Sequence, residues 1–369
     1  MSGPLAAARQ ARPGSRARRR LASLLTVMAL LVVGCTGPGA SPTPPAELVL
    51  MTHDSFAISE EVLDEFEQAN GVQLRVLRAG DAGAMVNQAI LAREAPLADV
   101  LFGVDNTFLS RALAANIFEP YRSPLLEHVP DALELDPDAR VTPIDYGDVC
   151  INYDRAAFSA ELPPPQSLEE LADPRYDGML VVQNPATSSP GLAFLLATIA
   201  RFGEGVGERG GWQGFWRALR ANDVLVTAGW EDAYFGAFSG GGGEGERPLV
   251  VSYATSPAAE ALSTAAPLDE APTGVVSDGC FRQIEFAGVL KGARAPELAR
   301  AFIDFMLSPT FQEDIPLNMF VFPANRQAEL PEVFVAHAEQ IEEPLTMEPT
   351  EIDALRERAI REWNDVVLR

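Results

Sequence analysis

Short apolar stretches alternate with amphipathic stretches along most of the chain. The apolar stretches have the length of buried strands, and the amphipathic ones repeat apolar residues with helical spacing. Strands that alternate with helices are typical of a largely parallel, doubly wound α/β sheet. Ser59 is placed to cap the first helix, and Gly71 to end it. In this first part the pattern predicts strands at 47–52, 72–77 and 99–104 and helices at 59–69, 84–93 and 106–115.

The same alternation begins again near residue 145 and predicts a second α/β unit. A glycine-rich run at 239–243 interrupts it. This run lacks the lysine and hydroxyl residue of a phosphate-binding loop, so we interpret it as an inserted loop tip. Apolar stripes on the last two helices predict packing against the sheets. The predicted strands here are 145–152, 179–183, 249–253 and 281–290, and the helices are 190–201, 297–307 and 349–369.

The beginning of the chain does not fit this alternation. Six arginines and no acid precede an apolar run at 21–33, which a glycine and Cys35 follow, as in a secretory signal. The end of that run resembles a bacterial lipobox, which implies cleavage before Cys35 and a lipid on its sulfur. The alternatives are an ordinary signal cut at another small residue and a weaker twin-arginine interpretation. We expect a signal peptide at 1–34, a flexible lipid-anchored tether at 35–46, and a protein held at the outer face of the cell membrane.

The chain is strongly acidic. It has 28 Lys and Arg against 52 Asp and Glu, for a net charge of −24. Because six of the arginines lie in the predicted signal, the exported part is more acidic still. Such a protein repels the phosphates of nucleic acids and attracts cations. We therefore expect no nucleic-acid partner, and a monomer that meets the membrane only through its lipid anchor.

Motifs for catalysis and metal binding are absent from the sequence. The histidines His53, His128 and His337 lie far apart, and no zinc-type cysteine pair, nucleophile elbow or Walker motif occurs. We expect neither an enzyme nor a bound metal or cofactor. An exported hydrolase that uses two of the many carboxylates is a less favoured alternative. Cys150 and Cys280 either form a disulfide, as an exported pair can, or remain two buried thiols.

Polar and aromatic residues gather where predicted strands end. Open α/β sheets bind ligands beyond the carboxyl ends of their strands, so these residues together predict a cleft. Hydroxyls and free N–H groups at a helix start suit an anionic group, whereas a tryptophan beside acids suits a flat cation. The residues concerned are Asp54, Ser55, Asp105, Thr187, Ser188, Trp230 and Tyr253.

The order and spacing of these segments resemble bacterial periplasmic thiamine-binding proteins, the solute receptors of thiamine ABC transporters. The similarity runs from about Leu48 to the C-terminus. Matching segments include DSFA at 54–57, NPATSSPGL at 184–192 and SYATSPA at 252–258. No segment is decisive alone, but their order is specific.

The resemblance implies an α/β, two-lobed periplasmic-binding-protein fold of type II. Two hinge strands would join the lobes, with the ligand cleft between them. Cys150 and Cys280 would then lie on neighbouring strands beside the hinge, where a disulfide leaves lobe closure free. The implied parts are 47–143 plus 283–330 for lobe 1, 144–282 for lobe 2, and 331–369 for C-terminal helices that pack on the lobes.

The resemblance also implies a ligand, thiamine or one of its phosphates. Thiamine joins a thiazolium cation to an aminopyrimidine, so it suits aromatic faces and nearby carboxylates. Trp230 and Tyr253 would stack on the rings. Asp54 and Asp105 would accept from the amine or balance the cation. The chain would then be an extracytoplasmic receptor that captures thiamine and delivers it to the permease of an ABC importer.

The resemblance implies further contacts, and the chain departs from the family at two positions. Thr187 and Ser188 would hold the hydroxyl or a phosphate, and Phe320 would close the apolar side where the family has a tryptophan. The chain departs from the family at Ala259 and His53, where the family has aromatic residues. Losing one aromatic wall weakens binding by ~1–2 kcal/mol or marks a changed ligand. A polyamine or a ferric ion remains an alternative, although the adjacent tyrosines typical of iron receptors are missing.

Overall fold

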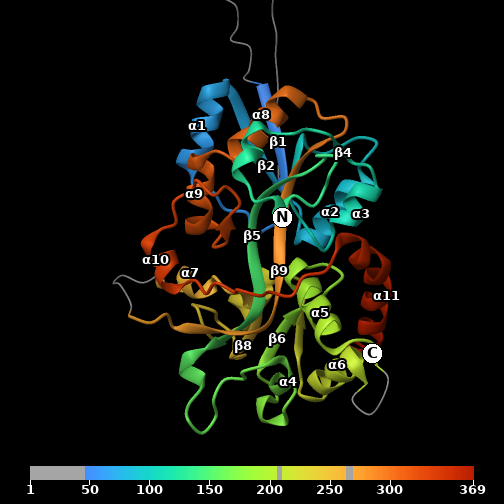
Figure 1. Ribbon diagram of the computed structural model, residues 1–369, viewed down its shortest axis with the longest axis vertical. Helices are drawn as coiled ribbons and strands as arrows, with labels where there is room; N and C mark the ends of the chain where they lie inside the picture. The colour runs from blue at the N-terminus through green and yellow to red at the C-terminus, as the bar shows by residue number, and fades with distance from the viewer. Residues whose placement is uncertain (1–45, 206–209, 263–268) are drawn as a thin grey trace, which may run out of the picture. The chain divides into compact units, whose positions relative to one another are not determined.

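The computed structural model describes residues 46–205, 210–262 and 269–369. The predicted signal, Cys35 and the tether up to residue 45 lie outside the described residues. A mixed sheet runs through the described part in the order β2-β1-β3-β9-β5-β8-β6-β7, and the short strands β4 and β10 pair with β9 and β5 (Figure 1). The strands are β1 (Ala46–Thr52), β2 (Val72–Arg78), β3 (Val100–Asp105), β4 (Phe118–Glu119), β5 (Thr142–Asp154), β6 (Leu180–Gln183), β7 (Leu225–Thr227), β8 (Leu249–Tyr253), β9 (Thr273–Leu290) and β10 (Phe322–Pro323).

Helices pack around this sheet. The α-helices are α1 (Glu60–Asn70), α2 (Ala82–Leu91), α3 (Leu109–Ala114), α4 (Leu168–Leu171), α5 (Ser189–Phe202), α6 (Gly211–Ala221), α7 (Ser256–Leu262), α8 (Pro296–Met306), α9 (Pro309–Asn318), α10 (Glu332–His337) and α11 (Pro349–Val367). Short 3₁₀ turns occupy Pro124–His128, Asp131–Leu133, Arg155–Ala157 and Pro174–Tyr176, and a π-helical turn occupies Asp232–Ala237.

Two strands connect the halves of the sheet. The parallel set β2-β1-β3 forms lobe 1, and the parallel set β8-β6-β7 forms lobe 2. Between them, β5 and β9 run antiparallel through 13 and 18 residues (Figure 1). This arrangement confirms the two-lobed α/β fold with two hinge strands. The exact residue limits of the lobes remain a prediction.

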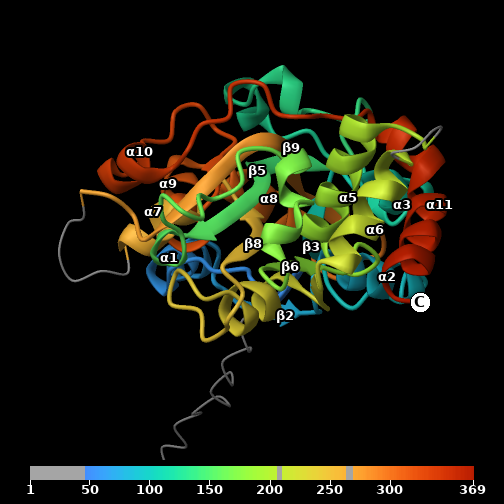
Figure 2. The same ribbon diagram turned by 90° about the horizontal axis from the view of Figure 1, so that it is seen from below.

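A disulfide and a helix add further connections. Cys150 of β5 and Cys280 of β9 are joined, which confirms the disulfide rather than two free thiols. The last helix, α11, packs against α6 of lobe 2 and α3 of lobe 1 (Figure 2). Arg356 of α11 donates to the Thr107 carbonyl at 3.2 Å, and Trp363 meets Trp216 edge-on at 5.5 Å. The C-terminal helix therefore touches both lobes.

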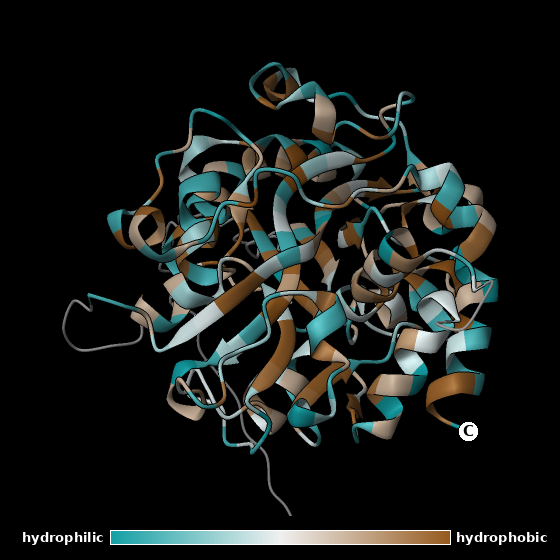
Figure 3. Ribbon diagram, turned by 60° about the horizontal axis from the view of Figure 1, so that its bottom comes forward, coloured by the Kyte–Doolittle hydropathy of each residue, from teal (hydrophilic) through white to brown (hydrophobic). Residues whose placement is uncertain are grey.

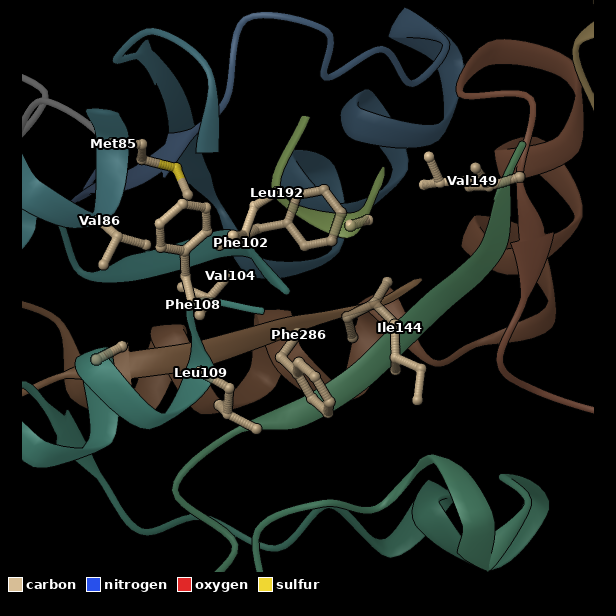
Figure 4. Close-up of a cluster of buried hydrophobic side chains, with 14 of the residues drawn as sticks. Met85, Val86, Phe102, Val104, Phe108, Leu109, Ile144, Val149, Leu192 and Phe286 are labelled. Atoms are coloured by element: carbon tan, nitrogen blue, oxygen red, sulfur yellow. The ribbon is translucent and has the colours of Figure 1, made fainter. Parts of the chain in front are cut away.

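A continuous hydrophobic core lies between the sheet and its helices. All six residues of β3 are buried, as expected of a strand covered on both faces. Figure 4 shows part of this core, where Phe102 of β3, Phe286 of β9 and Leu192 of α5 are drawn. Along the helices, hydrophobic and hydrophilic residues alternate (Figure 3). The apolar stripe predicted for the last helix is buried at Ile352 and Trp363, but α11 packs mainly on α6 and α3 and not, as predicted, on a sheet.

Most predicted elements occur within two residues of their expected limits, and the differences have local causes. The helix expected at 106–115 begins only at Leu109, because the Asp105 carboxylate accepts from the N–H groups of Thr107 and Phe108 and holds them in a turn. Gly71 ends α1 at φ 62°, as expected. Ser59 precedes α1 but does not cap it, since its hydroxyl donates to Asp314 at 2.9 Å.

Candidate functional site

A cavity of about 720 Å³ lies between the lobes, beyond the carboxyl ends of β1, β2, β6, β7 and β8. Its lining is acidic. Among the described residues that line it there is no lysine or arginine, and His53 is the one group that can become cationic. The lining carboxyl groups are Asp54, Asp81, Glu231, Asp232, Glu260 and Glu285.

One wall of the cavity is aromatic. Trp230 stacks on Tyr234 with 4.9 Å between ring centroids, and its ring meets that of Tyr253 at 6.5 Å. Two hydrogen bonds fix this wall. The Trp230 indole N–H donates to Ser252 at 2.9 Å, and the Tyr234 hydroxyl donates to Glu260 at 2.6 Å. A wall held in this way is ready to receive a flat ligand without rearrangement.

Asp81 joins the two lobes at one edge of the cavity. It precedes α2 in lobe 1 and accepts from the N–H of Ala82 at 2.7 Å. Its other oxygen accepts from the N–H of Trp230 in lobe 2 at 3.0 Å. Burial raises the pKa of Asp81 above its usual value, and these hydrogen bonds oppose the rise. The lobes also touch where the Gly83 N–H donates to the Thr187 carbonyl at 3.1 Å.

His53 and Glu285 face each other across the cavity floor. The His53 Nε2 atom lies 3.6 Å from a Glu285 carboxylate oxygen. Burial lowers the pKa of His53, but Glu285, Asp81 and Asp54 together outweigh it, so the pKa is raised. The imidazole lies against Gly103, where φ is 95° and an added Cβ would come within 2.2 Å of the ring. Only glycine therefore leaves room for His53 in this position.

The structure brings six of the eight predicted site residues to the cavity. The Asp54 side chain accepts from the Gly80 N–H at 3.0 Å, and the Thr187 hydroxyl donates to the Ala228 carbonyl at 2.6 Å. Their contact with a ligand remains a prediction. The six are Asp54, Ser55, Thr187, Trp230, Tyr253 and Phe320.

The other two, Asp105 and Ser188, do not line the cavity. The Asp105 side chain is completely buried and turns toward α3, where it accepts from Thr107 and Phe108. Ser188 is completely buried at the start of α5. Proximity to a strand end was the reason for expecting both, but that position does not decide which way a side chain points.

Several lining residues carried no prediction. Asp81 follows β2 as Asp54 follows β1, so the strand-end rule could have found it. Glu285 is an acid between the apolar residues Ile284 and Phe286 of a largely buried strand, which is a second usable signal. The glycine run forms a turn, and beyond what the sequence predicted, Gly241 and Gly242 line the cavity. Gly241 lies so close to Glu260 that a Cβ would come within 2.2 Å of its carboxylate.

Two structural features are absent from the part of the chain that the structure describes. There, no group of three or more His, Cys, Asp and Glu side chains is arranged to hold a metal ion. Within the same residues, no helix combines the length and apolar character needed to cross a bilayer.

Comparisons with known proteins agree with the two-lobed fold. Residues 95–339 match the family described as bacterial extracellular solute-binding protein. The chain is 32% identical over 350 residues to the thiamine-binding periplasmic protein of Escherichia coli, which covers 92% of this chain and 98% of the relative. It is 32% identical to the protein of that name from Brucella abortus, over 93% and 98% of the two chains. A solved periplasmic thiamin binding protein superposes with a TM-score of 0.76 at 29% identity, over 90% of this chain and 99% of the other.

Proposed function

Because the chain belongs to the bacterial extracellular solute-binding protein family, we propose that it is a receptor that captures thiamine and delivers it to an ABC importer. Binding makes and breaks no covalent bond. The lobes close around the ligand by bending at β5 and β9, the usual motion of two-lobed receptors. Thiamine phosphates are also candidates, because Thr187 and the start of α5 lie at the cavity.

The observation that carries this proposal is the combination of an aromatic wall with an acidic lining. A thiazolium ring is flat and permanently positive. Such a ring gains from an aromatic face, by about 0.5–2 kcal/mol, and from nearby carboxylates. Trp230 supplies the face, while Asp54 and Glu285 supply negative charge from lobe 1. Phe320 closes the side next to Val321 with apolar surface.

Tryptophan fluorescence tests the ligand directly. Trp212, Trp216 and Trp363 are at most 1% exposed, so a ligand in the cavity quenches mainly Trp230. We expect thiamine to quench the emission with submicromolar affinity. Trp230→Ala should weaken binding at least tenfold, since about 1.4 kcal/mol is tenfold. Trp230→Phe keeps a ring in place and should retain most of the affinity.

Micromolar or weaker binding that neither substitution changes would reject thiamine. Spermidine and ferric citrate are then the ligands to test by thermal shift. Spermidine would use the same acids but leaves the aromatic wall without a ring. Iron fits less well, because Tyr234 already donates to Glu260 and Tyr253 already accepts from Gln283. An exported hydrolase is the least favoured hypothesis. Turnover of a thiamine ester that is lost on substitution of a single Asp or Glu would support it.

We also propose that the receptor is an exported monomer with a lipid on Cys35. The support is the arginine-rich apolar start of the chain followed by a cysteine and a Pro- and Gly-rich tether. Mass spectrometry of the membrane fraction should find a chain that begins at lipid-modified Cys35. Cys35→Ser should release the protein from the membrane. A soluble wild-type chain cut elsewhere would contradict the anchor.

A further inference from the structure

Three carboxyl groups lie side by side across the hinge. Glu285 of β9 pairs in register with Asp105 of β3 on one side and with Asp145 of β5 on the other. Paired residues of antiparallel strands project to the same face of a sheet, so the three side chains form a row. Glu285 lines the cavity, whereas Asp105 and Asp145 are completely buried. We call these three residues the carboxyl row.

The outer members of the carboxyl row are poorly compensated as anions. Neither Asp145 oxygen, nor Oδ2 of Asp105, meets a hydrogen-bond donor among the described residues. A buried carboxylate without donors is unstable, whereas a protonated carboxyl brings its own donor. Burial and the charge of Glu285 raise the pKa of Asp145 well above its usual range. Burial also raises the pKa of Asp105 to about 7.

Groups from the neighbouring elements do not compensate a negative charge on Asp105 or Asp145. His53, which follows β1, pairs with Glu285 at 3.6 Å, the middle member of the row. The nearest cationic side chains of β9 and α11 are occupied elsewhere. Arg282 pairs with Asp148 at 2.6 Å on the opposite face of the strands, and Arg356 donates to the Thr107 carbonyl. The remaining titratable groups around the row are Asp54, Asp81 and Tyr253, which are acids.

We propose that binding of a cationic ligand in the cavity releases a proton from the carboxyl row to the solvent. The inference rests on the proposed function, because it needs a positively charged ligand near Glu285. A fixed positive charge beside a set of carboxyl groups stabilises their ionised forms. The proton that Asp145 or Asp105 held in the empty receptor then leaves. The carboxylate that remains is negative and balances the positive charge of the ligand.

Proton release makes affinity depend on pH with a definite sign. When binding releases protons, raising the pH favours the bound state, and each proton released gives up to about tenfold tighter binding per pH unit. We therefore expect thiamine to bind more tightly at pH 7.5 than at pH 6. The thiazolium keeps its charge throughout, and the aminopyrimidine nitrogen is protonated mainly in more acidic solution, so the dependence reports mainly on the protein.

Titration calorimetry measures the released protons. Thiamine is titrated into the full-length receptor at pH 7 in phosphate and in Tris, whose ionisation enthalpies differ, and the difference in binding heat gives the number of protons. We expect release on the order of one proton. Asp145→Asn should lose roughly half of it or more, because an amide has no proton that titrates in this range. Asp365→Asn, an exposed change of the same charge on α11, should lose none.

The outcomes separate the possible failures. Binding with equal heats in both buffers would overturn the proton release and leave the thiamine receptor standing. Absence of binding at any pH would reject the ligand, and the inference with it. His53→Gln distinguishes the source of the proton, because release that disappears in this variant comes from the imidazolium and not from the carboxyl row. If Asp145→Asn does not fold, the two-buffer comparison on the unmodified protein still decides.

Discussion

An acid at the end of a strand has two quite different environments in this protein. Asp54 and Asp81 line the cavity, while the Asp105 side chain turns away from it and holds the turn before α3. The local sequences do not differ in a way that separates them. What differs is the position in the ladder. Asp105 is itself paired with Glu285 of β9, whereas Asp54 and Asp81 lie beyond the last paired residues of β1 and β2.

The buried position of Asp105 predicts a pH effect on stability. Because its pKa is raised to about 7 in the folded protein, from 3.8, the unfolded chain loses its proton first as the pH rises. The free energy of unfolding should therefore fall between pH 4 and pH 7, by up to about 1.4 kcal/mol per pH unit from this group. Asp105→Asn should flatten that slope in thermal or urea unfolding. Parallel curves for the variant and the wild type would contradict the assignment.

At the scale of elements, the sequence predicted what periodicity controls. Helices such as α5 and α11 were found because their apolar stripes are long, and most strands because they are short apolar runs. The three-residue strand β7 and the first eight residues of β9 were not predicted. The π-helical turn at Asp232–Ala237 was missed, because it has no period of its own and forms around the contact between Tyr234 and Glu260. The candidate site was predicted only in part, because its residues depend on more than periodicity. Strand ends can be located from sequence, but the facing of Asp105 and the role of Glu285 depend on register.

The disulfide between β5 and β9 should stabilise the hinge region. It closes a loop of 130 residues, and such a crosslink typically contributes about 2–4 kcal/mol by restricting the unfolded chain. The double variant Cys150→Ala and Cys280→Ala should unfold at a lower temperature. Its thiamine affinity should change little, because neither cysteine lines the cavity. Reductant should lower the Tm of the wild type and leave that of the double variant unchanged. Equal Tm values for the wild type and the double variant without reductant would refute a stabilising role.

At the scale of the whole molecule, charge governs the encounter with the ligand. The chain has a net charge of −24, and the cavity lining repeats that sign locally. A negative surface that opens into a negative cleft attracts cations over distances that salt shortens.

Association should therefore slow as salt is added. In stopped-flow fluorescence, the association rate constant of thiamine should fall roughly threefold or more between 10 mM and 200 mM salt. A neutral aminopyrimidine that lacks the thiazolium ring is the matched control, and its rate should stay nearly constant. The same salt dependence for both compounds would show that charge does not guide the encounter.

The place of β9 in the sheet also bears on how the chain is made. β3 ends at Asp105, yet its neighbour β9 begins only at Thr273, after the whole of lobe 2. During synthesis, the first three strands wait for most of the polypeptide to emerge before their sheet can be completed. Until then the apolar edge of β3 stays open to any other strand. We therefore expect a chain with this topology to complete its first sheet only late in synthesis, and to be prone to wrong strand pairing at the edge of β3 until then.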